Sequence, residues 1–310
     1  MIKNLRVERV LLLILCILMI ANLVFTLQAR EIKVNNYETQ TVISHVPYII
    51  TQSGNYVLGG NLTCNDSKGT CIEIQADHVT LNLLGYTLRS SSSDLNRSIY
   101  GIYAKDRSHI TITNGMVEGF FYGIYLEDVS REGRYAPEYG WHTIKDIVTR
   151  KNTFRGIRVE GLCNTVTNNI VSYTGGTVFY KDAFAIGIES IGSNAYIIDN
   201  RVFETYATAN GEAVGISFTG TGDALLARGN MIVNTKHPTY DSWGIWASGD
   251  TGVFVTGNRI YGYNHGLGLA YDSHGSYDGN LVYGAKDPYR IYTPEIIDGG
   301  NNQDIQWPSH

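Results

Sequence analysis

Five polar side chains in the second half of the chain are suited to proton transfer on an acidic sugar: Arg158, Lys181, Glu189, His237 and Tyr240. Removing the proton next to a uronate carboxylate requires a cation that neutralises the carboxylate, together with a base and an acid. Arg158 or Lys181 supplies the cation, and a guanidinium binds a carboxylate with two parallel hydrogen bonds. His237 and Tyr240 supply the proton-transferring groups. As a catalytic set, these residues predict a uronate lyase or epimerase.

Paired carboxylates allow a second chemistry, the hydrolysis of a glycosidic bond. A hydrolase needs two carboxyl groups that flank the bond, and their separation decides the stereochemical outcome. The available pairs join Glu189 to Asp182, Glu212 or Asp241. Both chemistries remain open on the residues alone.

Aromatic side chains interleaved with charged ones predict an extended surface that binds a polysaccharide. Flat rings cover the apolar faces of sugars, while charges and amides bind hydroxyl or carboxylate groups. The alternative is an inert surface, because outward aromatic residues fit any pleated strand. The predicted substrate-binding residues are Tyr103, Tyr125, Asp182, Glu212, Asp241, Trp243 and Trp246.

The elements that must position these residues repeat along the chain. Alternating apolar residues predict short strands whose side chains point in turn into and out of a core. Self-similarity of this kind decides the fold before any single residue is interpreted. The segments open with Gly-Ile or Gly-Leu at residues 101, 123, 156, 187, 215, 244 and 266, and an Asn two residues before a hydrophobic residue follows at 152, 169, 200, 230, 258 and 280.

The spacing of these segments predicts an all-β solenoid. The shortest full periods, from Gly101 to Gly123 and from Gly244 to Gly266, are both 22 residues. This length suits three short strands wound once around an axis, and about eight to ten such coils are expected, stacked at roughly 4.8 Å. The Asn amides then hydrogen-bond from coil to coil. The recurrent Gly indicates a positive φ or a close backbone approach.

The connections between coils differ in length, and the long ones follow one another. From the ladder Asn to the next opening Gly the count is 18 residues after Asn169, 15 after Asn200 and 14 after Asn230. Loops that leave the same edge of consecutive coils stack into a wall, and such insertions commonly mark a binding face. These loops contain most of the candidate residues named above.

The Gly-Ile-x-apolar and Gly/Asp-Asn-x-apolar signatures cover roughly residues 60–290 and resemble the right-handed parallel β-helix proteins of the pectin-lyase-like superfamily. In the hydrolases of that group, acidic residues directly precede the opening residue of this strand. Here these positions hold Arg155, Ile186, Val214 and Trp243, so the resemblance favours a lyase or epimerase over a hydrolase. A non-catalytic surface, adhesive or periplasmic accessory protein of the same fold is the alternative.

The two ends of the chain are predicted to differ from the repeats. Residues 1–29 have a basic start and an apolar run, which predicts a signal peptide or a membrane anchor. Residues 30–62 are predicted as an N-terminal cap, 63–290 as the β-helix and 291–310 as a C-terminal cap or tail. The repeats are therefore expected to be secreted, periplasmic or at the cell surface. Contact with a membrane is expected only through an uncleaved N-terminal segment.

Charge and cysteine content limit the partners. The chain carries a net charge of −5, and without residues 1–30, which contribute four cations and Glu8, it carries −8. This balance argues against nucleic acid as a partner. Cys64 and Cys71 are predicted to form a disulfide in an oxidising compartment. No metal site is assigned. Calcium would find oxygen ligands in residues 298–304, although these do not form a clear site.

Overall fold

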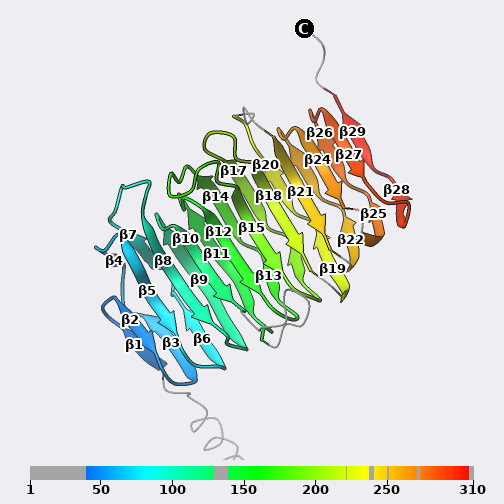
Figure 1. Cartoon of the computed structure of the whole chain (residues 1–310). Helices are drawn as coiled ribbons and strands as arrows, with labels where there is room; N and C mark the ends of the chain where they lie inside the picture. Colours follow the sequence, from blue (N-terminus) through cyan, green and yellow to red (C-terminus); the bar gives the residue numbers. More distant parts are fainter. Residues whose placement is uncertain are drawn as a thin grey trace, which may run out of the picture. The chain divides into compact units, whose positions relative to one another are not determined.

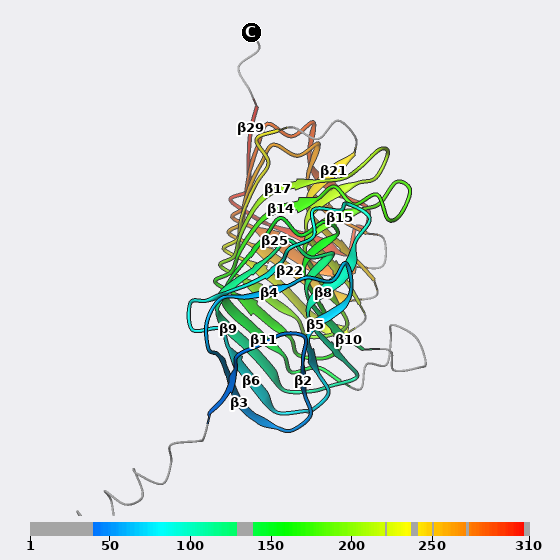
Figure 2. The same ribbon diagram turned by 90° about the vertical axis from the view of Figure 1, so that its left-hand side faces the viewer.

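The repeating segments form a right-handed parallel β-helix, as expected. The computed structural model describes residues 40–128, 139–220, 222–236, 241–249, 251–270 and 273–306. Figure 1 shows the strands of successive coils side by side, and Figure 2 shows the coils superposed, with the loops that follow β14 and β17 projecting from the stack. All strand pairs are parallel, and every assigned element in these ranges is a strand.

One wall of the solenoid is a ten-stranded sheet with one strand from each coil, so there are ten coils in the described chain. Its strands are β2 (Tyr48–Ile50), β5 (Lys68–Ile74), β8 (Ser98–Lys105), β10 (Tyr122–Glu127), β12 (Arg155–Glu160), β15 (Ala185–Ile191), β18 (Ala213–Thr219), β21 (Ser242–Ser248), β24 (His265–Leu269) and β27 (Asp287–Ile291).

The other walls belong to a nineteen-stranded sheet made of two ladders that share β9 and β11. The first ladder contains β1 (Gln40–Ile43), β3 (Gly54–Leu58), β6 (Val79–Asn82), β9 (Ile110–Glu118), β11 (Thr143–Arg150), β13 (Thr165–Thr167), β16 (Tyr196–Ile198), β19 (Gly222–Arg228), β22 (Thr251–Thr256), β25 (Ser273–Asp278) and β28 (Ile296–Gly300). The second adds β4 (Leu62–Cys64), β7 (Thr87–Ser90), β14 (Ile170–Gly175), β17 (Arg201–Tyr206), β20 (Met231–Val233), β23 (Arg259–Tyr261), β26 (Leu281–Tyr283) and β29 (Gln303–Ile305).

The predicted ends fall partly outside the described residues. Among the described residues, no helix has the length and apolarity needed to span a membrane. The segment predicted as a signal peptide or anchor lies outside them. Strands β2 and β3 lie in the segment predicted as a cap and pair with β5 and β6 of the next coil. The exact domain boundaries stay a prediction.

The residue after each opening Gly builds the core. In the ten-stranded sheet these residues are in register from coil to coil, and each is fully buried. A column of aliphatic side chains, Ile in all coils but one, packs closely, because each coil repeats the shape of the one before it. The column runs through Ile102, Ile124, Ile157, Ile188, Ile216, Ile245 and Leu267, and Ile72, which follows Cys71, extends it by one coil.

The opening Gly is required by close approach between coils. These glycines have no positive φ. A Cβ atom added to Gly215 would lie 2.7 Å from the carbonyl oxygen of Gly244 and 2.3 Å from Cγ2 of Ile232. Of the two reasons predicted for the recurrent Gly, close backbone approach is therefore the correct one.

The Asn ladder is confirmed along the second half of the solenoid. Nδ2 of Asn200 donates to Oδ1 of Asn230 (3.1 Å), and Nδ2 of Asn230 donates to Oδ1 of Asn258 (2.9 Å). The backbone N–H of each ladder Asn donates to the same oxygen of the next. The ladder consists of Asn169, Asn200, Asn230, Asn258, Asn280 and Asn302, joined by five amide–amide bonds.

The prediction that Asn152 belongs to this ladder is wrong. The backbone N–H of Ile147 donates to Oδ1 of Asn169 (2.9 Å), so Ile147 holds the ladder position in that coil. Asn152 lies at the following corner and accepts the N–H of Phe120 (2.9 Å). The reason is that β11 continues through the corner where other coils begin a new strand.

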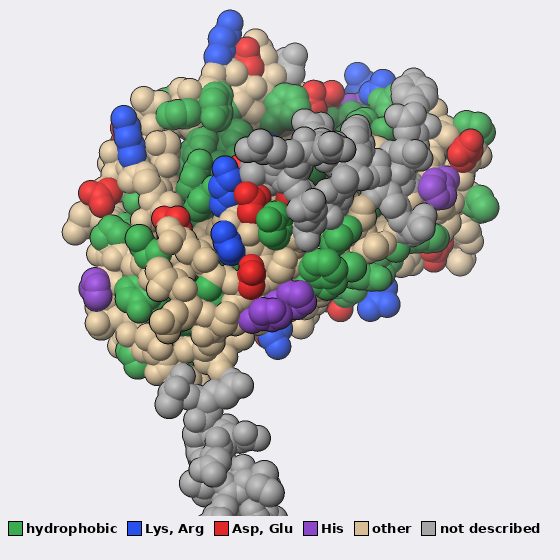
Figure 3. Space-filling model, turned by 60° about the horizontal axis from the view of Figure 1, so that its bottom comes forward, with side chains coloured by type: hydrophobic (Ala, Val, Ile, Leu, Met, Phe, Trp, Pro, Cys, Tyr) green, Lys and Arg blue, Asp and Glu red, His purple; other side chains and the backbone are tan. Residues whose placement is uncertain are grey.

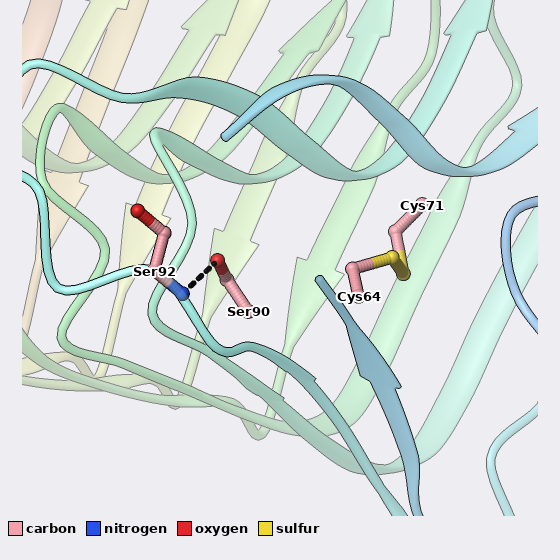
Figure 4. Close-up of a disulfide and its surroundings, with 4 residues drawn as sticks. All are labelled: Cys64, Cys71, Ser90 and Ser92. Carbon is pink, nitrogen blue, oxygen red and sulfur yellow. Dashed lines mark hydrogen bonds between the residues drawn. A yellow bond between two sulfur atoms is a disulfide. The ribbon is translucent and has the colours of Figure 1, made fainter. Parts of the chain in front are cut away.

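The predicted disulfide is confirmed. Cys64 at the end of β4 and Cys71 in β5 are bonded, with their Cα atoms 6.0 Å apart (Figure 4). Both cysteines are buried. The bond therefore joins the two sheets within the N-terminal coils, next to the loop that contains Ser92.

Replacing Asn230 by Ala is expected to lower the free energy of unfolding by about 3 kcal/mol, because buried donors and acceptors in three coils lose their partners. The carbonyl of Ile197 and the N–H of Asn200 are among them. Urea unfolding measures the loss. The matched control is Asn302→Ala, on the last rung, where the equivalent hydrogen bonds are only partly buried and their loss should cost less. Equal losses in the two variants would contradict this role of the ladder.

Replacing Cys64 and Cys71 together by Ala is expected to lower the free energy of unfolding by about 2–3 kcal/mol, since the bond restricts the unfolded chain over a short loop. The two cysteines are seven residues apart. Unfolding is measured with and without a reductant. The reductant should destabilise the natural protein and leave the double variant unchanged. An effect on the variant would mean that the reductant acts elsewhere.

Candidate functional site

The predicted row of outward side chains on the ten-stranded sheet is present. Tyr103 pairs with Tyr125, Tyr125 with Arg158, and Arg158 with Glu189. The row continues through Ser217 to Trp246. Residues that are far apart in the sequence are therefore direct neighbours along this face.

Arg158 takes part in a network of ion pairs instead of standing free. Its guanidinium contacts Glu160 at 2.5 Å and Glu189 at 3.0 Å, and Arg155 contacts the same oxygen of Glu189 at 2.8 Å. Burial alone would raise the pKa of Glu189, but Arg155 and Arg158 outweigh this effect and lower it. The network holds two cations and two carboxylates, so Arg158 is not the uncompensated cation that the lyase hypothesis requires.

The tyrosines of the row are hydrogen-bonded to carboxylates. Tyr103 donates to Glu127, and Tyr125 donates to Oε1 of Glu160 (3.1 Å). Burial and the neighbouring carboxylates raise the pKa of both phenols. Tyr122 stacks on Tyr125 with ring centroids 4.6 Å apart. These tyrosines therefore form a packed, protonated cluster in which Tyr122 and Tyr125 are buried and Tyr103 is half-buried.

A cleft with a volume of about 410 Å³ lies beside this network and brings together several predicted residues. Glu189, Glu212, Trp243 and Trp246 line it, together with Ser217. The volume falls in the range of small-ligand sites, about 300–1,000 Å³. Trp243 and Trp246 stand edge to face with ring centroids 4.6 Å apart, and Trp246 is half-buried.

An acidic group with one histidine borders the cleft. The Trp243 indole N–H donates to the carboxylate of Glu212, and the Trp243 ring stacks on His265 with a centroid separation of 4.0 Å. Nε2 of His265 lies 2.7 Å from Asp241, and Nδ1 lies 3.6 Å from Asp287. Burial and the charge of Asp241 raise the pKa of Glu212. Glu212 therefore keeps its proton to a higher pH than an exposed glutamate.

The first two of the three long loops stack as predicted, and a further loop joins them; residues 237–240 of the third lie outside the described residues. Thr208 donates to the carbonyl of Thr177 (2.7 Å), and the N–H of Val178 donates to the carbonyl of Leu95 (3.1 Å). Together, residues 91–97, 176–184 and 207–212 form what we call the loop wall. Asp182 accepts the N–H of Asn210 (3.1 Å) and so links two of these loops.

The structure therefore unites only part of the predicted site. Glu189, Glu212, Trp243 and Trp246 meet at one cleft, and Asp241 borders it through His265. Lys181 is exposed on the loop wall and is not among the residues that line the cleft. His237 and Tyr240 lie outside the described residues.

Sequence reasoning missed three residues of this region. Arg155 was noted only because it stands where the related hydrolases have an acidic residue. In the structure it is buried and pairs with Glu189. Glu160 was not assigned to the site, and His265 was not connected with Asp241. Strand register alone would have identified the first contact, because Arg155 and Ile186 are direct partners and Glu189 follows in the same strand.

The fold and the cleft define a right-handed parallel β-helix protein with a ligand-sized depression on one sheet, which confirms the resemblance to the pectin-lyase-like superfamily. Residues 67–292 match the model of the NosD family, described as "Periplasmic copper-binding protein (NosD)". The chain belongs to this family. The periplasmic description agrees with the predicted location outside the cytoplasm. No curated protein matches the chain.

Two solved structures are similar in backbone. The Dettilon tailspike protein (gp208) is 13% identical, with a TM-score of 0.49, over 85% of this chain and 59% of that one. The surface adhesin PfbA of Streptococcus pneumoniae is 10% identical, with a TM-score of 0.38, over 87% of this chain and 82% of that one. This chain thus spans less than two thirds of the tailspike chain. At these values neither similarity extends to function.

The described residues do not fit a copper centre. Copper is bound by imidazole, thiolate and thioether groups, and no group of three or more His, Cys, Asp or Glu in the described ranges is arranged to hold a metal ion. His78 stacks on His109, with ring centroids 4.5 Å apart. His142 is buried; Nδ1 accepts the N–H of Ile110, and burial lowers its pKa to about 4. Figure 3 shows histidines, cations and carboxylates dispersed over one face.

Replacing Glu212 by Gln is expected to stabilise the protein more at pH 7 than at pH 4. A raised folded-state pKa means that this residue favours folding below its unfolded pKa, near 4.5, and that this contribution is lost as the pH rises through the folded pKa. Thermal unfolding at both pH values measures the difference. Glu118→Gln is the matched control, since Arg150 lowers the pKa of Glu118 and the sign is opposite. The same sign in both variants would refute the assignment.

Proposed function

We propose that this exported β-helix protein binds a polysaccharide chain in the cleft of the ten-stranded sheet. The observation that carries the proposal is the pair Trp243 and Trp246 beside Glu212 in one depression of about 410 Å³. A half-buried indole offers a flat apolar surface that suits the face of a sugar ring. Ser217 and Glu212 offer hydrogen-bonding groups for sugar hydroxyls.

The charge of the cleft favours a neutral or amino sugar over a uronate. Arg155 and Arg158 are paired with Glu189 and Glu160, so their charges are compensated. Glu212 lines the cleft, and Asp241 lies next to it. A polyanionic chain would meet these carboxylates without a free cation. The proposal therefore keeps the predicted sugar ligand and does not depend on a uronate carboxylate.

Hydrolysis of the bound chain is a second candidate function, and the raised pKa of Glu212 favours it. A carboxyl group that keeps its proton can act as the general acid toward a glycosidic oxygen. Asp241, which contacts His265, is the second carboxylate next to the cleft. The lyase hypothesis loses support because Arg158 is compensated.

Replacing Trp246 by Ala is expected to weaken binding of the polymer by about tenfold or more, as for truncation of an aromatic anchor in a central pocket. A glycan array first identifies a ligand among neutral, amino and uronate polymers, and calorimetry then compares the variants. Trp141→Ala is the matched control. Trp141 is 42% exposed and stacks on His109, and it does not line the cleft.

Release of reducing ends from the ligand would support the hydrolase candidate, and Glu212→Gln should abolish the release. New double bonds would instead restore the lyase hypothesis. Absence of binding to any glycan, or equal losses for Trp246→Ala and Trp141→Ala, would contradict the proposal.

A further inference from the structure

A second hollow, with a volume of about 500 Å³, shares no residue with the cleft. We call it the Arg97 pocket. It spans five successive coils: Arg89 lies on β7, Glu118 on β9, Lys151 directly after β11, Tyr173 on β14 and Tyr206 on β17. The loop wall contributes Leu95 and Arg97 to its lining. The pocket thus combines the outer face of the nineteen-stranded sheet with one of the stacked loops.

The lining of the Arg97 pocket is cationic, although the chain as a whole is acidic. Three cations, Arg89, Arg97 and Lys151, face one carboxylate, that of Glu118, which gives a local charge of 3 − 1 = +2. The net charge of the chain is −5. Glu118 is already held by Arg150 at 2.8 Å and by Lys151 at 3.7 Å. A positive excess therefore remains to attract an anion.

Arg97 is the most unusual residue of this pocket. Its exposed fraction is only 5%, and Nε has no hydrogen-bond partner among the described residues. Nη1 donates to the carbonyl of Asp94 (2.8 Å), and Nη2 donates to that of Lys151 (3.4 Å). A guanidinium has five N–H donors, and it lies here without a contacting carboxylate in the described ranges. Burial lowers the pKa of Arg97, and the nearby Asp94 offsets this effect only in part. An anion in contact with the guanidinium would relieve the remaining cost.

Hydroxyl groups and phenol rings complete the lining. The Ser90 hydroxyl accepts the N–H of Ser92 (3.2 Å), and the Ser92 hydroxyl accepts the N–H of Asp94 (3.3 Å). Each hydroxyl therefore keeps its own proton to donate. Figure 4 shows Ser90 and Ser92 beside the disulfide. The half-exposed rings of Tyr173 and Tyr206 offer flat surfaces in the same pocket.

We infer that the Arg97 pocket binds an oxyanion group, a phosphate, sulfate or carboxylate, carried by a hydroxylated ligand such as a sugar. Guanidinium and ammonium groups are the usual partners of these anions, and serine hydroxyls add neutral donors. The tyrosine rings suit the carrier of the anion. This site is independent of the glycan cleft, because its cations and its aromatic residues are different ones.

Calorimetry on the full chain tests this inference with four probes: inorganic phosphate, glucose 6-phosphate, glucuronic acid and glucose. The anionic probes should bind, and glucose should not. Arg89→Gln and Lys151→Gln should each weaken anion binding about tenfold, since a charge-assisted hydrogen bond is lost. The matched control is Lys145→Gln, on β11, an exposed lysine that does not line the pocket. Added salt should weaken binding to the natural protein.

Tighter binding of glucose 6-phosphate than of phosphate would support the site and identify a sugar as the carrier. Equal binding of the two would support the site with a free anion as its ligand. No binding of any anion, or equal losses in Lys145→Gln and Lys151→Gln, would overturn the inference. Arg89 and Lys151 are exposed at the surface, so these variants are expected to fold. Trp246→Ala should leave anion binding unchanged, which separates this result from the test of the cleft.

Discussion

The structure depends on the hydrogen-bonded register between coils. Each coil exchanges backbone hydrogen bonds with the coils on both sides, and in the second half of the solenoid the buried Asn ladder fixes one corner of each coil. The stacked backbones lie at the strand spacing of roughly 4.8 Å. The nearest neighbours of a side chain are therefore the side chains at the equivalent positions of the coils above and below. A shift of one residue would turn the core column outward. The register between coils therefore determines both the core and every surface row.

Register also explains why charges on this surface occur in compensated pairs. An outward cation lies within contact distance of one outward side chain in each adjacent coil. The free energy of folding therefore depends on whether those neighbouring side chains carry the opposite charge. Arg158 meets Glu189 and Arg150 meets Glu118 in this way, and Arg155 contacts the same Glu189 from three residues earlier in its strand. Removing one member of a buried pair would leave the other uncompensated. In such a fold, a row of alternating charges stabilises the stacking of the coils, and it does not by itself identify a functional site.

Repetition made the fold predictable and made part of the site unpredictable. The Gly-Ile segments and the Asn spacing predicted the coils, the core column and the ladder, because the same local rule applies in every coil. Asn152 was misplaced where β11 departs from that rule. The loops do not repeat, so spacing could predict that they stack but not which side chains turn toward the cleft. Asp182 instead links two loops, and Arg158 is held by carboxylates two residues away and one coil away.

The cleft and the Arg97 pocket can coexist because the interactions that define them are local. The loop wall supplies Phe184 to the cleft and Leu95 to the pocket, so one set of stacked loops borders both. In the cleft the guanidinium charges are neutralised within the protein, and an aromatic surface beside carboxylates remains. In the pocket the single carboxylate leaves a positive excess around Arg97. Charges at the surface are screened beyond about 10 Å in salt solution. One acidic solenoid can therefore bind a neutral or amino sugar in the cleft and an anionic ligand in the Arg97 pocket.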